Sequence, residues 1–211
     1  MKKTFILLII ALCLIPNSLA FAIEKPLSLT STQKIEELKK LEIVNCYEDG
    51  SFHPEKKITR AEFCKMVAVM LGMEKNSKTS NIFADVPAEH WANRYVTFCY
   101  DKKLIQGKAK NEFAPDDYII YQEALKIMVS ALGYEPFTAR NGGYPHGYIF
   151  EATKLGISSG FASSHTECIT RETAADIIYN SLFVPLLVEI EDDSETVSYV
   201  ISDKSLYDSL K

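Results

Sequence analysis

Residues 58–72 read Ile-Thr-Arg-Ala-Glu-Phe-Cys-Lys-Met-Val-Ala-Val-Met-Leu-Gly, and this stretch decides the fold because it recurs twice. A shift of 61 residues lays 42–73 on 103–134 without a gap, and a further shift of 50 places Ile169 on Ile119. Each copy has a mostly apolar stripe at i, i+3, i+4, i+7 and i+8, the pattern of an amphipathic helix. The stripes are Phe63, Met66, Val67, Met70 and Leu71; Ala124, Ile127, Met128, Ala131 and Leu132; Ala174, Ile177, Ile178, Ser181 and Leu182. Three equivalent stripes predict three helices that pack on one another.

A second helix is predicted before each of these, so each repeat is a helix, a loop and a helix. The predicted spans are about 31–41, 90–103 and 146–155. Four residues of the second span share one face at helical spacing: Trp91, Tyr95, Phe98 and Cys99. Such units bury a continuous core only when stacked, which suits a short solenoid or a closed pseudo-threefold bundle. The predicted fold class is mainly α.

Threonine and glycine residues are expected to mark the ends of the repeated helices. Thr59 and Glu62 have the spacing of a capping box, and we favour this structural role for both over ligand binding. Thr170 holds the position of Thr59 in the third copy. Gly72 and Gly133 follow their helices as C-terminal caps.

The first 22 residues are typical of a secretory signal peptide. Lys2 and Lys3 form a basic start, Phe5–Ile15 is an apolar run, and Ala-Phe-Ala at 20–22 is a cleavage pattern. Eleven apolar residues are too few for a span, which takes about 20. We therefore expect an exported protein with no membrane span after cleavage; an uncleaved anchor is the alternative.

The chain divides into five predicted parts, and the last of these differs from the repeats because it is rich in acidic residues. Residues 197–201 alternate weakly, as a strand does, so an irregular or β-like tail is expected there. The parts are the signal peptide 1–22, repeats at 23–74, 75–136 and 137–185, and the tail 186–211.

Composition and motifs exclude several classes of function. The formal charge is −5, and it becomes −7 without Lys2 and Lys3, which argues against nucleic-acid binding. The sequence has none of the common nucleophile, phosphate-loop or zinc-protease motifs, so we expect no catalytic residues, no cofactor and no enzyme activity.

Four cysteines remain after the signal peptide: Cys46, Cys64, Cys99 and Cys168. In an exported chain they permit disulfides in three pairings, which the sequence leaves open. None is in a C-x-x-C pair and no histidine lies at ligand spacing, so no metal site is expected. Cys64 and Cys99 fall on apolar helix faces, where buried small apolar side chains are the better interpretation.

Four short motifs occur in order, and a fifth stands in the first copy at the place that follows them in the repeat; this set resembles the S-layer homology (SLH) domain family. They are Phe83-Ala84-Asp85-Val86-Pro87, His90-Trp91-Ala92, Leu104-Ile105-Gln106-Gly107, Phe113-Ala114-Pro115-Asp116, and Ile58-Thr59-Arg60-Ala61-Glu62-Phe63. The resemblance covers about residues 30–184. It implies three SLH repeats around a central three-helix bundle. It also implies that the protein is exported and attached to the bacterial cell wall or S-layer, by binding secondary cell-wall polysaccharide, often pyruvylated, in grooves between repeats.

Arg60 and Arg171 are the leading ligand candidates that this resemblance implies. A guanidinium offers a planar fork to the carboxylate of a pyruvyl ketal, and a helix N-terminus adds N–H groups. For Arg60 a structural salt bridge is the equal alternative. The second copy has Tyr121 in this place and Ile120 before it, so its groove is expected to be inactive or altered.

Four further residues complete the candidate ligand-binding set. Trp91 can stack on a sugar, although its helical spacing favours core packing. Asp85 either binds sugar hydroxyls or caps a turn, and we favour the cap. Gly107, in the turn motif, and Tyr144, in the opening of the third repeat, are also included.

These features lead to one hypothesis and two rivals. The leading one is a non-enzymatic module that attaches an exported protein to a wall glycan linked to peptidoglycan. The rivals are the shortened front end of a larger surface protein or wall enzyme, and a protein–protein adaptor of the outer surface.

Overall fold

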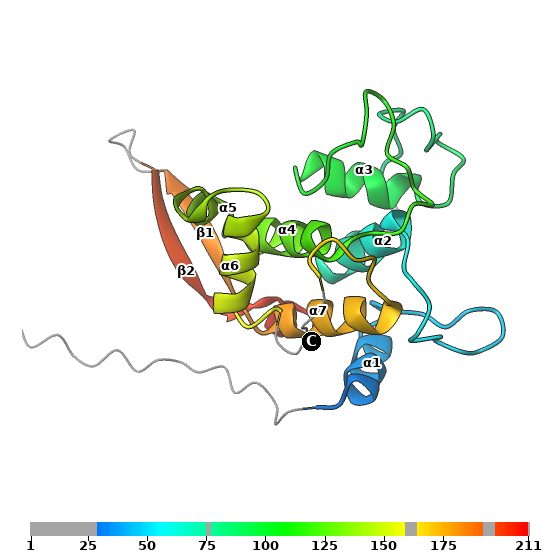
Figure 1. The fold of residues 1–211 in the computed structure, drawn as a ribbon, viewed down its shortest axis with the longest axis horizontal. Helices are drawn as coiled ribbons and strands as arrows, with labels where there is room; N and C mark the ends of the chain where they lie inside the picture. Colours follow the sequence, from blue (N-terminus) through cyan, green and yellow to red (C-terminus); the bar gives the residue numbers. More distant parts are fainter. Residues whose placement is uncertain (1–28, 75–76, 159–163, 192–196, 211) are drawn as a thin grey trace, which may run out of the picture.

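The computed structural model describes residues 29–74, 77–158, 164–191 and 197–210, and the predicted signal peptide lies outside them. The elements are α1 (Ser31–Lys40), α2 (Arg60–Met70), α3 (Asn93–Asp101), α4 (Tyr121–Ala131), α5 (Glu135–Thr138), a 3₁₀ turn (Ala139–Asn141), α6 (His146–Lys154), α7 (Arg171–Leu182), β1 (Pro185–Glu191), β2 (Val197–Ser205) and α8 (Leu206–Ser209). The fold is mainly helical, as predicted, with a two-stranded antiparallel sheet near its C-terminal end (Figure 1).

The three repeated helices, α2, α4 and α7, are joined at their N-terminal ends by a ring of backbone hydrogen bonds. Ile58 N–H donates to the carbonyl of Ile169 (3.1 Å), Ile169 N–H to that of Ile119 (3.1 Å), and Ile119 N–H to that of Ile58 (3.2 Å). Because the third bond returns to the first repeat, the arrangement is a closed pseudo-threefold bundle and not an open solenoid.

The other helix of each repeat packs on a neighbouring repeat. Helix α3 packs on α2, α6 packs on α4, and α1 packs on α7 (Figure 1). Each opening helix therefore covers the core helix of the preceding repeat, and α1 joins the first repeat to the last. A repeat buries its core face only when its neighbours are present.

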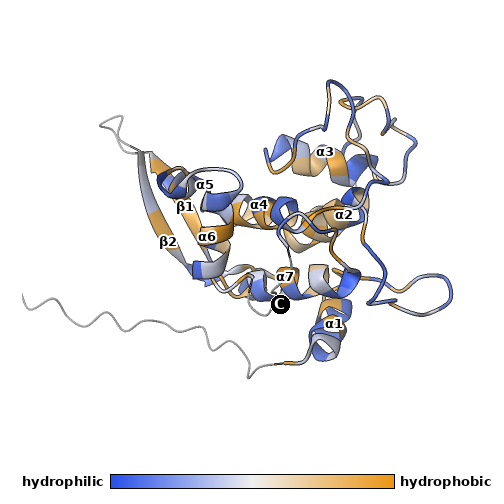
Figure 2. Ribbon diagram, viewed as in Figure 1, coloured by the Kyte–Doolittle hydropathy of each residue, from blue (hydrophilic) through white to orange (hydrophobic). Residues whose placement is uncertain are grey.

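The apolar stripes form the core, and the expected caps hold their ends. Figure 2 shows apolar residues along α2, α4 and α7, of which Phe63, Met128 and Ile177 are fully buried. The capping box of Thr59 and Glu62 is complete, with both reciprocal hydrogen bonds. Thr170 Oγ1 accepts from the N–H of Thr173 at the start of α7, without the reciprocal bond of a capping box. Gly72 and Gly133 have φ of +74° and +86°, as left-handed C-terminal caps require.

The expectation that Trp91 packs in the core is wrong. Helix α3 begins only at Asn93, so Trp91 precedes the helix and the helical spacing does not apply to it. Its side chain is 52% exposed, whereas Tyr95 and Cys99, which lie within the helix, are buried.

The C-terminal region is an integral part of the fold. The expected strand at 197–201 lies within β2, and Leu187 and Leu206 are buried in the common core. Leu187 N–H donates to the carbonyl of Leu132 (2.9 Å), and Tyr134 Oη donates to that of Pro185 (3.0 Å). These contacts attach the hairpin to the end of α4. Among the described residues, no helix is long and apolar enough to cross a membrane.

Candidate functional site

A pocket of about 350 Å³ lies where repeats 1 and 2 meet, and we call it groove A. Its floor comes from α4 and from the loop after α3, and Arg60 enters from α2. Groove A is lined by Arg60, Leu104, Ile105, Gln106, Gly107, Lys108, Glu123, Lys126, Ile127 and Tyr144.

A second pocket, of about 180 Å³, lies where repeats 3 and 1 meet, and we call it groove B. Every lining residue occupies the repeat position of a residue in groove A. Eight of these pairs, Glu62 and Glu123 among them, are 61 residues apart. Arg171 and Trp91 occupy the positions of Arg60 and Tyr144. Groove B is lined by Ile43, Val44, Asn45, Cys46, Tyr47, Glu62, Lys65, Met66, Trp91 and Arg171. The two grooves are therefore copies of one site.

Arg60 is held by the neighbouring repeat on every side. Its Nε donates to the carbonyl of Phe113 (3.0 Å) and Nη2 to that of Gln106 (3.3 Å), while Nη1 lies 3.1 Å from Glu123 Oε2. The guanidinium also lies over the Phe113 ring, 4.7 Å from its centroid. Arg60 thus forms a salt bridge and hydrogen bonds that connect repeats 1 and 2.

Arg171 repeats this geometry in groove B. Its Nε donates to the carbonyl of Phe52 (2.9 Å), Nη2 donates to that of Asn45 (3.0 Å), and Nη1 lies 3.7 Å from Glu62 Oε1. Both arginine side chains are less than a tenth exposed. These contacts use three of the five N–H donors of Arg60 and two of those of Arg171, so each guanidinium has donors left.

The N-terminus of α2 is closed, contrary to the expectation that helix N-termini help to bind an anion. Arg60 N–H donates to the carbonyl of Asp117 (2.8 Å), Ala61 N–H to that of Pro115 (3.0 Å), and Glu62 N–H to Thr59 Oγ1 (3.2 Å). The first N–H groups of α4 and α7 are taken up in the same way by loop carbonyls. The first N–H groups of these helices are thus used in hydrogen bonds within the protein, and none of them is left to donate to a ligand.

Lys65 and Lys126 are the cations that sequence reasoning missed. They stand at equivalent positions in grooves B and A, and neither forms an ion pair with another of the described residues. The alignment of the three copies does contain a signal for this position: the first two copies have a lysine there, and the third has Asp176. Groove A also contains two cations that are already paired: Arg60 with Glu123, and Lys108 with Asp117.

Each groove has one half-exposed aromatic side chain in its wall. Trp91 is 52% exposed in groove B, and Tyr144 is 48% exposed in groove A. Burial raises the pKa of Tyr144 above its ordinary value, so its phenol stays neutral at physiological pH and adds no negative charge to the groove. A flat apolar face beside a cation is a suitable surface for a sugar ring.

The remaining two candidate residues, Asp85 and Gly107, make close contacts within the fold. Asp85 accepts hydrogen bonds from the N–H groups of Phe113 (2.9 Å) and Ala114 (2.6 Å) and lines neither groove, which is a capping role on a loop distant in sequence. Gly107 lines groove A, and a Cβ there would lie 2.5 Å from the carbonyl oxygen of Glu112, so only glycine fits.

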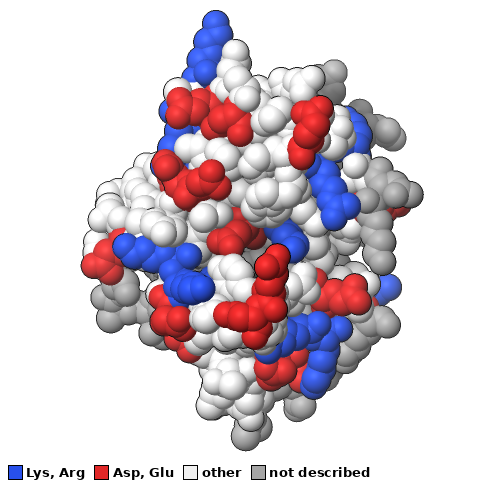
Figure 3. Space-filling model, turned by 90° about the vertical axis from the view of Figure 1, so that its right-hand side faces the viewer, with Lys and Arg blue, Asp and Glu red and all other residues white. Residues whose placement is uncertain are grey.

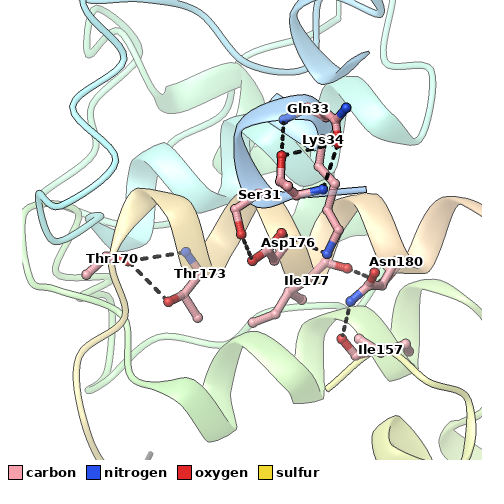
Figure 4. Close-up of polar contacts among 11 residues, drawn as sticks. Ser31, Gln33, Lys34, Ile157, Thr170, Thr173, Asp176, Ile177 and Asn180 are labelled. Carbon is pink, nitrogen blue, oxygen red and sulfur yellow. Dashed lines mark hydrogen bonds and ion pairs between the residues drawn. The ribbon is translucent and has the colours of Figure 1, made fainter. Parts of the chain in front are cut away.

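The third inter-repeat position, interface C, lies where repeats 2 and 3 meet and where α1 covers α7. Tyr121 replaces the arginine, Thr173 the glutamate and Asp176 the lysine. Asp176 accepts a hydrogen bond from Ser31 Oγ (2.8 Å) and forms an ion pair with Lys34 (2.9 Å), as Figure 4 shows. The lysine position of grooves A and B is thus occupied by an internal ion pair.

Charged side chains of both signs alternate on the face shown in Figure 3, without a continuous patch of one sign. Among the described residues, no cluster of histidine, cysteine and acidic side chains is arranged to hold a metal ion.

These observations define a class: a three-repeat helical bundle, closed by a ring of backbone hydrogen bonds, with pockets between its repeats. A sequence model of the S-layer homology domain matches residues 33–64 and 82–125, and the chain belongs to this family. The match falls on the first two repeats, and the internal alignment supplies the third.

The chain is similar to several cell-surface proteins. It is 29% identical over 191 residues to the Middle cell wall protein of Brevibacillus brevis, covering 86% of this chain and 18% of that protein. It is 31% identical over 157 residues to a Cell surface protein of Thermoanaerobacter kivui, covering 72% and 20%. It is 38% identical over 80 residues to the Cellulosome-anchoring protein of Acetivibrio thermocellus, covering 36% and 18%.

The chain spans a fifth or less of the length of these relatives. The family and its cell-surface relatives indicate a secreted protein associated with the cell wall or cell surface.

Proposed function

We propose that this chain is a non-enzymatic anchoring module that binds an anionic secondary cell-wall polysaccharide, with grooves A and B as its two binding sites. The observation that carries the proposal is the recurrence of one lining set in both grooves: a buried arginine, a lysine without an ion-pair partner among the described residues, and a half-exposed aromatic ring.

In this proposal each group has its own role. The lysine ammonium of Lys65 or Lys126 attracts a glycan carboxylate, such as that of a pyruvyl ketal, and the remaining N–H donors of the arginine orient it. Trp91 or Tyr144 packs against the sugar ring. The ion pair of the arginine with Glu62 or Glu123 keeps the guanidinium in place without neutralising the lysine.

The proposal is tested by sedimentation of the protein with purified wall sacculi before and after chemical removal of the secondary polymer. Binding should fall at least tenfold after removal. The Lys65→Ala/Lys126→Ala variant should lose a similar share of binding to intact sacculi. The matched control, Lys40→Ala/Lys110→Ala, removes two exposed positive charges outside the grooves and should bind as the parent does. Equal binding to stripped and intact sacculi contradicts the proposal.

A second candidate function is that of an anchoring part within a longer surface protein. It is favoured by the limited share of each relative that is similar to this chain, a fifth or less. Reading the gene downstream for an in-frame continuation tests it.

A further inference from the structure

Cys64 and Cys99 bring two thiols together between neighbouring repeats. Cys64 lies on α2, the core helix of repeat 1, and Cys99 lies on α3, the opening helix of repeat 2 that covers it. Both residues are at most 1% exposed, and Cys99 Sγ lies 3.6 Å from the carbonyl oxygen of Cys64. Both thiols are free in this structure.

The chemistry of the pair agrees with this geometry. A hydrogen bond with the Cys64 thiol, followed by burial, raises the pKa of Cys99 well above its ordinary value. Once folded, the Cys99 thiol is therefore protonated, and both side chains are shielded from solvent where α2 and α3 pack. Cys46 is exposed and Cys168 is half-buried, so the chain provides two cysteines outside this pair for comparison.

We propose that Cys64 and Cys99 are a modification site, at which export to an oxidising compartment converts the two thiols into a disulfide between α2 and α3. Each sulfur gives up one proton and one electron as the S–S bond forms. The oxidant is the disulfide of a thiol oxidase or of a small disulfide, whose own S–S bond breaks to give two thiols. The exchange takes place while the helices are still assembling, since both sulfurs become inaccessible when they dock.

The position of the pair gives the bond a structural consequence. Helix α3 is held to the bundle mainly by its packing on α2, and Trp91, the aromatic wall of groove B, lies two residues before α3 begins. Lys65 of the same groove follows Cys64 directly in the sequence. A disulfide at this place therefore fixes the two sides of groove B relative to each other and constrains the unfolded chain.

The test compares the protein refolded from denaturant in a glutathione redox buffer with the protein refolded in dithiothreitol. We expect a non-reduced digest of the first sample to contain one linked peptide pair with Cys64 and Cys99, about 2 Da lighter than the sum of its thiol forms. Its melting temperature should exceed that of the reduced sample by about 10 °C. The Cys46→Ser/Cys168→Ser variant should behave identically, and Cys64→Ser should abolish both effects.

Two results overturn the proposal. One is complete alkylation of Cys64 and Cys99 when the glutathione-refolded protein is denatured in the presence of iodoacetamide. The other is a linked peptide that joins either residue to Cys46 or Cys168. Because the parent protein under two redox conditions gives the answer, the test does not depend on whether a variant folds.

Discussion

Grooves A and B and interface C occupy equivalent places in a closed threefold bundle, yet only the first two combine a buried arginine, a lysine and a half-exposed aromatic ring. All three are built on the same ring of backbone hydrogen bonds at Ile58, Ile119 and Ile169. The backbone therefore imposes the threefold arrangement without regard to the groove residues. The difference lies wholly in the side chains placed on it.

The groove side chains are kept or replaced as a set, and electrostatics explains why. The arginine and the glutamate of each groove come from different repeats, so removal of one would leave the other charged and largely buried. In interface C both are replaced, by Tyr121 and Thr173. The lysine is replaced by Asp176, whose charge is compensated by Lys34 of α1. Interface C is thus satisfied internally, whereas grooves A and B have cations left for a ligand.

The largest effect is expected from removing a buried arginine. Arg60→Ala leaves Glu123 without its ion pair and two loop carbonyls without donors, which should destabilise the fold by about 3–5 kcal/mol. Urea denaturation measures this loss. Tyr121→Phe is the matched change in interface C and should cost at most about 1 kcal/mol. Equal losses for the two variants would remove the distinction between the interfaces.

The next effect concerns the ion pair of interface C. Asp176→Ala removes the acceptor of Ser31 and Lys34 and should destabilise the protein by about 2–3 kcal/mol, because the pair is largely buried. Binding to wall sacculi should be unchanged, because the proposed binding sites are grooves A and B. Glu36→Ala, which breaks an exposed ion pair with Lys39 on the same helix, is the control and should cost less than about 1 kcal/mol.

Trp91 allows groove B to be observed by itself, because it is the single tryptophan of the chain. Binding of a glycan fragment should shift its fluorescence emission to shorter wavelength as water is displaced from the half-exposed ring. Lys65→Ala should abolish the shift, and Lys126→Ala should leave it intact. Trp91→Phe should weaken binding at groove B about tenfold, corresponding to roughly 1–2 kcal/mol, with little change in stability. The same shift in both lysine variants would disprove the assignment of groove B.

The smallest effect tests the helix caps, which also differ among the repeats. Thr59→Ala should cost about 1 kcal/mol, as for a typical N-terminal cap. Ile120 holds this position before α4 and provides no side-chain cap. Ile120→Thr should therefore stabilise the protein by up to about 1 kcal/mol, measured by urea denaturation. A loss of stability would show that Ile120 contributes more by packing than a cap would provide.

Much of the fold could be predicted from the sequence, because periodicity and internal repetition report which helix faces are buried. The same signals do not distinguish a solenoid from a closed bundle. The hydrogen bonds that decide between them join backbone atoms far apart in the sequence, such as those of Ile58 and Ile169, which are 111 positions apart. Trp91 was misplaced because helical spacing was extended two residues beyond the start of α3.

The candidate site was predicted only in part. Arg60 and Arg171 were found because they stand in a recognisable motif, but their ion pairs depend on which repeats are neighbours. The lysines were overlooked because a lysine on a helix is ordinarily an exposed surface residue. Only the comparison of Lys65 and Lys126 with Asp176, the equivalent residue of the third copy, distinguishes these lysines from ordinary surface lysines.

The central claim is that grooves A and B take a glycan and interface C does not. Calorimetric titration of the protein with a purified glycan fragment that carries one terminal carboxylate tests it most directly. We predict two sites per chain, one site in Lys65→Ala or in Lys126→Ala, and none in the double variant. Three sites in the parent protein, or two sites in the double variant, would contradict the account.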